Sequence, residues 1–153
     1  MEIRKIVIAT DGSPASAAAL DFGLELALDR GAEAVVLHVI ATREAGHVFG
    51  VDRAEPPTRE ELIAGSPALA QGALFAAGHA VDATLELVAA DGTQETADAI
   101  LGVASGRDAD LIVMGTRGQG PLATAVIGSV SNAVLRAAST TTVIVVRAPE
   151  PDA

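Results

Sequence analysis

The sequence predicts an α/β protein built on a parallel β-sheet with helices on both faces. Short apolar runs typical of buried strands alternate along the whole chain with segments that have the apolar spacing of helices. This alternation favours parallel strands joined by right-handed crossovers. The length of 153 residues fits one domain with a full core. We expect a single domain over residues 1–148 and a short tail over residues 149–153.

The first part of the chain predicts two strands with a helix between them. Residues 3–10 and 32–40 are nearly continuous apolar runs, as expected of strands covered on both faces. Ser13 and Pro14 predict the helix start, because a serine hydroxyl caps a helix and proline suits its first position. Gly31 is placed to end this helix. Its predicted apolar face is formed by Ala17, Leu20, Leu24 and Ala27.

The next segment predicts a loop and then an interrupted helix. Residues 41–57 are polar and contain two glycines and two prolines, so we predict a loop there. Thr58 and Glu61 match a capping box, which predicts a helix start. The Gly-Ser-Pro sequence at 65–67 interrupts the helical pattern, so we expect this helix to be kinked or split.

The second half continues the alternation. Residues 81–88 predict a strand near the sheet edge, because one face is polar, and residues 109–115 predict a buried strand. Helices are predicted over residues 93–105 and about 128–138, and a last strand over 141–147. The apolar face of the first of these helices comprises Ala97, Ile100, Leu101 and Ala104.

Composition excludes several classes of function. The formal net charge of −10 argues against nonspecific nucleic-acid binding, and the lack of Tyr and Trp removes base-stacking surfaces. With no cysteine, disulfides and thiolate metal sites are impossible. No signal peptide is evident, and no segment has the roughly 18 apolar residues that a membrane helix needs. We therefore expect a cytoplasmic protein that binds neither nucleic acid nor membranes.

A glycine-rich segment between a predicted strand and a predicted helix is the strongest candidate site. It places Gly115, Gly118 and Gly128-Ser129 at intervals of two and nine residues. Glycines let a ligand approach the backbone, and the helix start adds N–H donors and partial positive charge, so the pattern suits a phosphate. The spacing matches neither a Walker A loop nor a GxGxxG fingerprint.

This pattern, within "MGTRGQGPLATAVIGSVSN", resembles the nucleotide-binding signature of the universal stress protein family. The resemblance covers nearly the whole chain, because "KIVIATDGSPAS", "AVVLHVI", "ADLIVMGTRG" and the closing "TVIVVR" follow in the family's order. It implies a Rossmann-like, doubly wound parallel sheet of five strands in the order 3-2-1-4-5. In such a sheet, ligands bind at the carboxyl ends of strands 1 and 4, where the order reverses.

The resemblance also implies the residues that hold the nucleoside of ATP. Ala9 and Thr10 would line the adenine pocket, and the backbone of Val39 would contact adenine. Asp11 matches an aspartate of ATP-binding members, and a carboxylate there could accept hydrogen bonds from a ribose hydroxyl or an adenine amine. The residues alone leave an alternative open, in which Asp11 and the following glycine form a turn that only ends the strand. Val39 could equally be an ordinary core valine, which is compatible with the same backbone contact.

The glycine signature would hold the phosphates and the ribose. The matching positions are Gly115, Gly118, Gly128 and Ser129. Met114 matches a backbone contact, and Arg117 either offers a guanidinium to a phosphate or points into solvent. The N–H groups of Val130 and Ser131, or the Ser131 hydroxyl, could also reach a phosphate. The alternative for Ser129 is a plain helix cap.

The predicted function is ATP binding by a nucleotide-responsive regulatory module in stress response, with protein partners unknown. Because the chain is acidic, backbone donors and Mg²⁺ are the candidates for holding the phosphates. No catalytic triad or P-loop lysine stands out, and His38 fits a satisfied core histidine, so we expect at most slow ATP hydrolysis. The alternatives are a dimeric stress or scaffold protein without nucleotide binding and a small adenylate-using enzyme. The resemblance implies a homodimer through the last strand.

Overall fold

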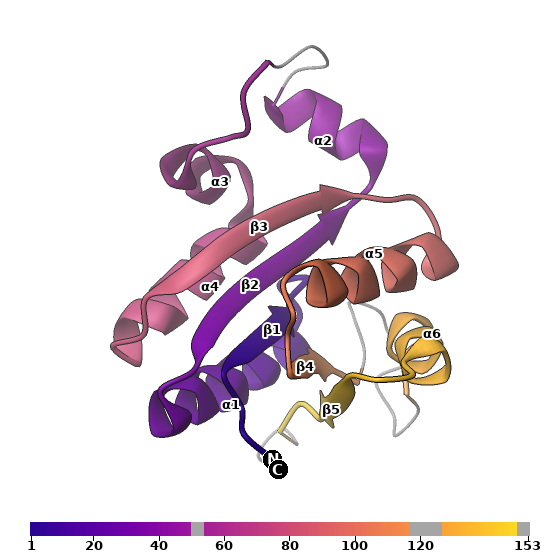
Figure 1. Cartoon of the computed structure of the whole chain (residues 1–153). Helices are drawn as coiled ribbons and strands as arrows, with labels where there is room; N and C mark the ends of the chain where they lie inside the picture. The colour runs from indigo at the N-terminus through magenta and orange to yellow at the C-terminus, as the bar shows by residue number, and fades with distance from the viewer. Residues whose placement is uncertain (50–53, 117–126, 150–153) are drawn as a thin grey trace.

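The central sheet has the predicted architecture (Figure 1). The computed structural model describes residues 1–49, 54–116 and 127–149. Five strands, all parallel, lie in the order β3-β2-β1-β4-β5. Their bounds are β1 Lys5–Ala9, β2 Glu33–Ile40, β3 Ala83–Ala89, β4 Leu111–Gly115 and β5 Thr142–Val146. The edge position expected for the third strand is confirmed, and the strand order reverses between β1 and β4.

Helices cover both faces of the sheet (Figure 1). The bounds are α1 Pro14–Arg30, α2 Thr42–Phe49, α3 Arg59–Gly65, α4 Pro67–Gly78, α5 Thr93–Gly106 and α6 Ser129–Ala137. On one face, α1, α3 and α4 pack against alternate strand residues such as Ile6 and Ile8. On the other, α5 and α6 pack against Val7 and Ile112. Because both faces are buried, the central strands read as continuous apolar runs rather than alternating ones.

Helix α1 begins and ends where the sequence predicts. The Ser13 hydroxyl accepts a hydrogen bond from the Ser16 N–H at 3.2 Å, and Pro14 follows as the first helical residue. Gly31 ends the helix in the left-handed conformation, with φ of 63°. The predicted apolar face is confirmed for Leu20, Leu24 and Ala27, which are buried, but Ala17 is only partly buried.

The loop predicted over residues 41–57 is wrong in its first part, because Thr42–Phe49 forms helix α2. The glycine at position 46 argues against a helix by only about 1 kcal/mol relative to alanine. The Asp91 carboxylate accepts a hydrogen bond from the Thr42 N–H at 3.0 Å, and hydrogen bonds with the side chain and then the backbone of Thr42 lower the pKa of Asp91. This contact holds the first turn of α2 and joins residues far apart in the sequence, so no local pattern reveals it.

The predicted break in the second helix is confirmed as a split into α3 and α4. Thr58 and Glu61 form the predicted capping box at the start of α3. Ser66 serves both helices, because its N–H donates to the Leu62 carbonyl at 3.0 Å and its hydroxyl accepts from the Leu69 N–H at 3.2 Å. No helix in the described part of the chain has the length and apolar character to cross a membrane.

Candidate functional site

The carboxyl ends of β1 and β4 bring most of the predicted site residues together. Ala9, Thr10 and Asp11 end β1, while Met114 and Gly115 end β4, and these two strands are adjacent. The start of α6 joins them, through a hydrogen bond from the Gly128 N–H to the Thr116 carbonyl. Val39 lies near the end of the neighbouring β2. The predicted contacts of Arg117 and Gly118 lie outside the described residues.

The turn after β1 is held by its own polar groups. Thr10 is buried, and its hydroxyl donates to the Ser16 hydroxyl at 3.1 Å. One carboxylate oxygen of Asp11, Oδ1, accepts a hydrogen bond from the Ser13 N–H at 2.9 Å. This bond forms an Asx turn, as expected if Asp11 serves to end the strand. The side chain of Asp11 is exposed, and no described residue bonds its second oxygen. The turn and a ligand contact are therefore compatible, with one oxygen for each.

Val39 carries unpaired backbone groups at the site. In a parallel ladder, alternate residues direct both N–H and C=O to the same neighbouring strand. The Leu37 carbonyl accepts the Thr10 N–H at 2.8 Å, so Val39, two residues on, also directs its backbone toward the β1 side. Because β1 ends at Ala9, no described residue pairs with these groups of Val39. They offer one donor and one acceptor, side by side, to a ligand.

Gly115 is required by packing within the fold. A Cβ built on Gly115 would lie 2.7 Å from the carbonyl carbon of Ala15 and 2.8 Å from its Cβ. The end of β4 therefore meets the first turn of α1 at a distance that only glycine allows. Met114 is buried in the core on the opposite face, which leaves only its backbone for the predicted contact.

The hydroxyl of Ser131 is used inside the protein. Ser131 is buried, and its hydroxyl lies 3.0 Å from the Thr116 carbonyl oxygen and 3.1 Å from that of Gly128. The Thr116 N–H in turn donates to the Val146 carbonyl of β5 at 2.8 Å. The hydroxyl thus helps to hold the end of β4 against the start of α6, and its donor is not available for a phosphate.

The start of α6 lacks a side-chain cap. Gly128 is the capping residue and Ser129 is the first helical residue with an exposed side chain, so the alternative of Ser129 as a helix cap is wrong. The N–H groups of Ser129, Val130 and Ser131 have no acceptor among the described residues. Unpaired N–H groups at a helix start, with the partial positive charge of the helix, suit an anion.

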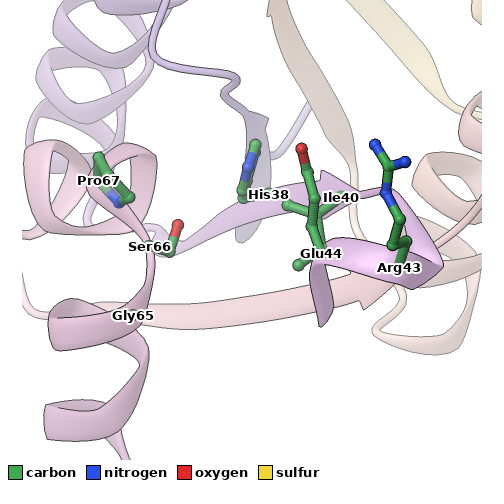
Figure 2. A pocket seen from close by; sticks show the side chains of 7 residues that line it. All are labelled: His38, Ile40, Arg43, Glu44, Gly65, Ser66 and Pro67. Carbon is green, nitrogen blue, oxygen red and sulfur yellow. The ribbon is translucent and has the colours of Figure 1, made fainter. Parts of the chain in front are cut away.

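A pocket beside β2 was not predicted from the sequence. It measures about 360 Å³ and is lined by His38 and Ile40 of β2, Arg43 and Glu44 of α2, and residues 65–67 (Figure 2). His38 Nδ1 lies 2.7 Å from the Thr10 carbonyl oxygen, so the expectation of a satisfied histidine is confirmed. The one signal in the sequence was the Gly-Ser-Pro break at 65–67, which faces the end of β2 across this pocket.

Metal-ligand side chains do not cluster in the described ranges, where no group of three His, Asp or Glu residues could hold an ion.

The fold and the glycine signature agree with a known family. The family model described as "Universal stress protein family" matches residues 2–147. The chain belongs to the universal stress protein family. No curated protein matches this sequence.

Solved universal stress proteins share the fold over nearly their whole length. One from Archaeoglobus fulgidus is 23% identical, with a TM-score of 0.68, and the match covers 95% of this chain and 99% of that one. UspA from Lactobacillus plantarum is 22% identical, with a TM-score of 0.67 and coverage of 96% and 99%. An A. fulgidus universal stress protein in complex with dAMP is 24% identical, with a TM-score of 0.65 and coverage of 95% and 99%.

Proposed function

We propose that this universal stress protein binds ATP at the carboxyl ends of β1 and β4 and acts as a nucleotide-responsive regulatory module. The main support is the uncapped start of α6, where three N–H groups lack acceptors among the described residues at the reversal of the strand order. One related structure containing dAMP and another containing cAMP add support at the level of nucleotides in general.

The proposed arrangement follows the order of the strands. The phosphates lie at Ser129 and Val130, the ribose lies near the free oxygen of Asp11, and adenine meets the unpaired backbone of Val39. Arg117 and Gly118 remain proposed phosphate contacts on the strength of the motif. Mg²⁺ is a proposed companion of the phosphates, since it would offset part of the formal charge of −10 on the chain.

We expect regulation by occupancy rather than rapid turnover. No P-loop lysine follows the glycines of the signature, and the described residues of the site include no carboxylate or imidazole at the start of α6. At most slow hydrolysis is consistent with a site made largely of backbone donors. The further proposals are a single domain over residues 1–148, a cytoplasmic location and a homodimer.

One substitution tests the backbone donors of α6 without removing the helix. Ser129→Pro deletes the N–H of the first helical residue, a position that tolerates proline. Gly128 has φ of −63° and ψ of 162°, which suits a residue before proline. We expect Ser129→Pro to weaken ATP binding roughly tenfold or more, the effect of a lost hydrogen bond to a charged group. Calorimetry on nucleotide-stripped protein with Mg²⁺ measures this.

Ser129→Ala is the matched control, because it removes the hydroxyl and keeps the N–H, and it should bind ATP more tightly than Ser129→Pro. Asp11→Ala should also weaken binding. Equal affinity of Ser129→Pro and Ser129→Ala would contradict a phosphate at the start of α6. Absence of binding to the parent at millimolar ATP would overturn the proposed function as a whole.

A dimeric stress or scaffold protein without bound nucleotide is the second candidate. Two observations favour it, since Gly115 is explained by packing against Ala15 and the Ser131 hydroxyl by bonding to Thr116. Part of the signature is therefore accounted for without a ligand. The unpaired N–H groups of α6 and backbone of Val39 have no such account, and they favour ATP binding.

A further inference from the structure

The pocket beside β2 adjoins the proposed nucleotide site. The two share a hydrogen bond, because His38 lines the pocket while its Nδ1 lies 2.7 Å from the carbonyl oxygen of Thr10 at the end of β1. Val39, with its unpaired backbone, is the next residue of the same strand. The pocket is therefore adjacent to the residues that we propose to contact the ribose and adenine.

Strand spacing brings the base of a bound nucleotide to this place. β4, β1 and β2 are consecutive in the sheet, so the end of β2 lies two strand spacings, roughly 10 Å, from the end of β4. This distance is comparable to the length of a nucleoside. A nucleotide with phosphates at α6 and ribose beside Asp11 extends its base over the end of β2. This step rests on the proposed function.

The hydrogen bond to Thr10 decides what His38 offers to a ligand. A carbonyl oxygen can only accept, so the proton of the neutral ring lies on Nδ1, and Nε2 is left as an acceptor. No described residue bonds Nε2 of His38. In Figure 2 the ring stands between Ser66 and Pro67 on one side and Ile40 and Glu44 on the other. Ile40 and Pro67 supply apolar walls suited to a flat ring.

We infer that the pocket receives the outer edge of the base and that His38 determines specificity for 6-aminopurines. Nε2 accepts a hydrogen bond from the exocyclic amine, while the base also meets the backbone of Val39. A 6-oxopurine places an acceptor against this acceptor. Within the half-buried surroundings of His38, that mismatch disfavours guanine and hypoxanthine nucleotides.

The test compares ATP with ITP, which differ at this exocyclic group. We expect the parent to prefer ATP by about tenfold or more, the effect of leaving a buried acceptor unpaired. His38→Leu removes the acceptor, so the ratio of the two affinities should fall toward one. His38→Gln keeps an amide oxygen as acceptor and an N–H for Thr10, and it should restore part of the preference. A purely structural role of His38 would weaken both nucleotides alike and leave the ratio unchanged.

His79→Gln is the matched control. His79 Nδ1 also lies near a backbone carbonyl oxygen, that of Phe75 at 2.8 Å, but this histidine ends α4 and does not line the pocket. The ATP to ITP ratio of His79→Gln should equal that of the parent. An unchanged ratio in His38→Leu, with ATP still bound and Ser129→Pro still weakened, would overturn this inference and leave the proposed function standing.

Free bases separate the remaining outcomes. If neither nucleotide binds, the proposed function fails, and titration with adenine and hypoxanthine tests the pocket alone. Amide resonances of Gly65 and Ser66, which line the pocket, should shift with adenine and much less with hypoxanthine. Shifts confined to the turn after β1, or no shifts, would overturn the assignment of the pocket to the base.

Discussion

Gly115 and Ser131 each hold the end of β4 against a neighbouring helix, which is α1 for Gly115 and α6 for Ser131. The glycine at position 115 suggests the approach of a phosphate, which stays a prediction, and the sequence does not reveal the contact with the Ala15 backbone that the structure shows. The reason is physical, because both a ligand and a neighbouring helix require the absence of a Cβ. The same holds for Ser131, because the sequence alone does not distinguish a serine whose hydroxyl contacts a phosphate from one whose hydroxyl bonds the Thr116 carbonyl.

Gly115→Ala tests the packing role at the residue scale. A Cβ there would lie 2.7 Å from backbone carbon of Ala15, which cannot shift cheaply, so we expect a loss of about 1–3 kcal/mol in the free energy of unfolding. Urea denaturation measures it. Gly102→Ala in α5 is the control, because nothing lies within 4 Å of its Cβ, and it should stabilise the protein by about 0.5–1 kcal/mol. Unchanged stability of Gly115→Ala would show that Ala15 accommodates the added methyl group.

At the scale of elements, local chemistry predicted most boundaries. Ser13 begins α1, the capping box begins α3 and the Gly-Ser-Pro break separates α3 from α4, all as expected, since caps and prolines act over a few residues. The sequence does not predict helix α2, because the first turn of this helix is held by Asp91, which follows the carboxyl end of β3 and is far from α2 in the sequence. The pocket of His38 was missed for the same reason, since it is assembled from β2, α2 and the α3–α4 junction.

A second long-range carboxylate contact predicts a pH dependence of stability. Asp110, just before β4, accepts the N–H groups of Arg4 at 2.8 Å and Lys5 at 3.0 Å, and these bonds lower the pKa of its carboxyl group. Because the pKa is lowered in the folded state, the ionised carboxylate stabilises the protein at pH values above the ordinary aspartate pKa of about 3.9. This contribution to stability is lost as the pH falls through the folded pKa. Asp110→Asn should therefore be less stable than the parent at pH 7.

The measurement is chemical denaturation of the parent and Asp110→Asn at pH 7 and at pH 3. The difference between their midpoints should shrink at the lower pH, because the parent carboxyl then approaches the neutral state of the variant. Asp29→Asn, which changes an exposed aspartate of α1, is the control for the general loss of negative charge. A constant difference between the two midpoints would show that ionisation of Asp110 does not stabilise the junction of β1 and β4.

For the whole molecule, the alternation of strands and helices predicted the parallel sheet, and the family resemblance predicted its order. The sheet leaves β5 at an edge, with Val143–Val146 only partly buried. An apolar, β-branched edge strand favours pairing with another chain. This observation supports the proposed homodimer, in which β5 of two copies would meet across a two-fold axis.

Val145→Pro tests that dimer at the backbone. The Val146 carbonyl accepts the Thr116 N–H of the β4 side, so Val145, one residue before, directs its N–H away from β4. Proline at this edge position removes an outward donor and leaves the ladder to β4 intact. We expect a dimeric parent and a largely monomeric Val145→Pro in light scattering after gel filtration. Val145→Thr is the control, because it keeps the N–H and the branched shape, so it should remain dimeric. A parent that is monomeric at tens of micromolar would exclude this interface, and β5 would then be an unpaired edge strand.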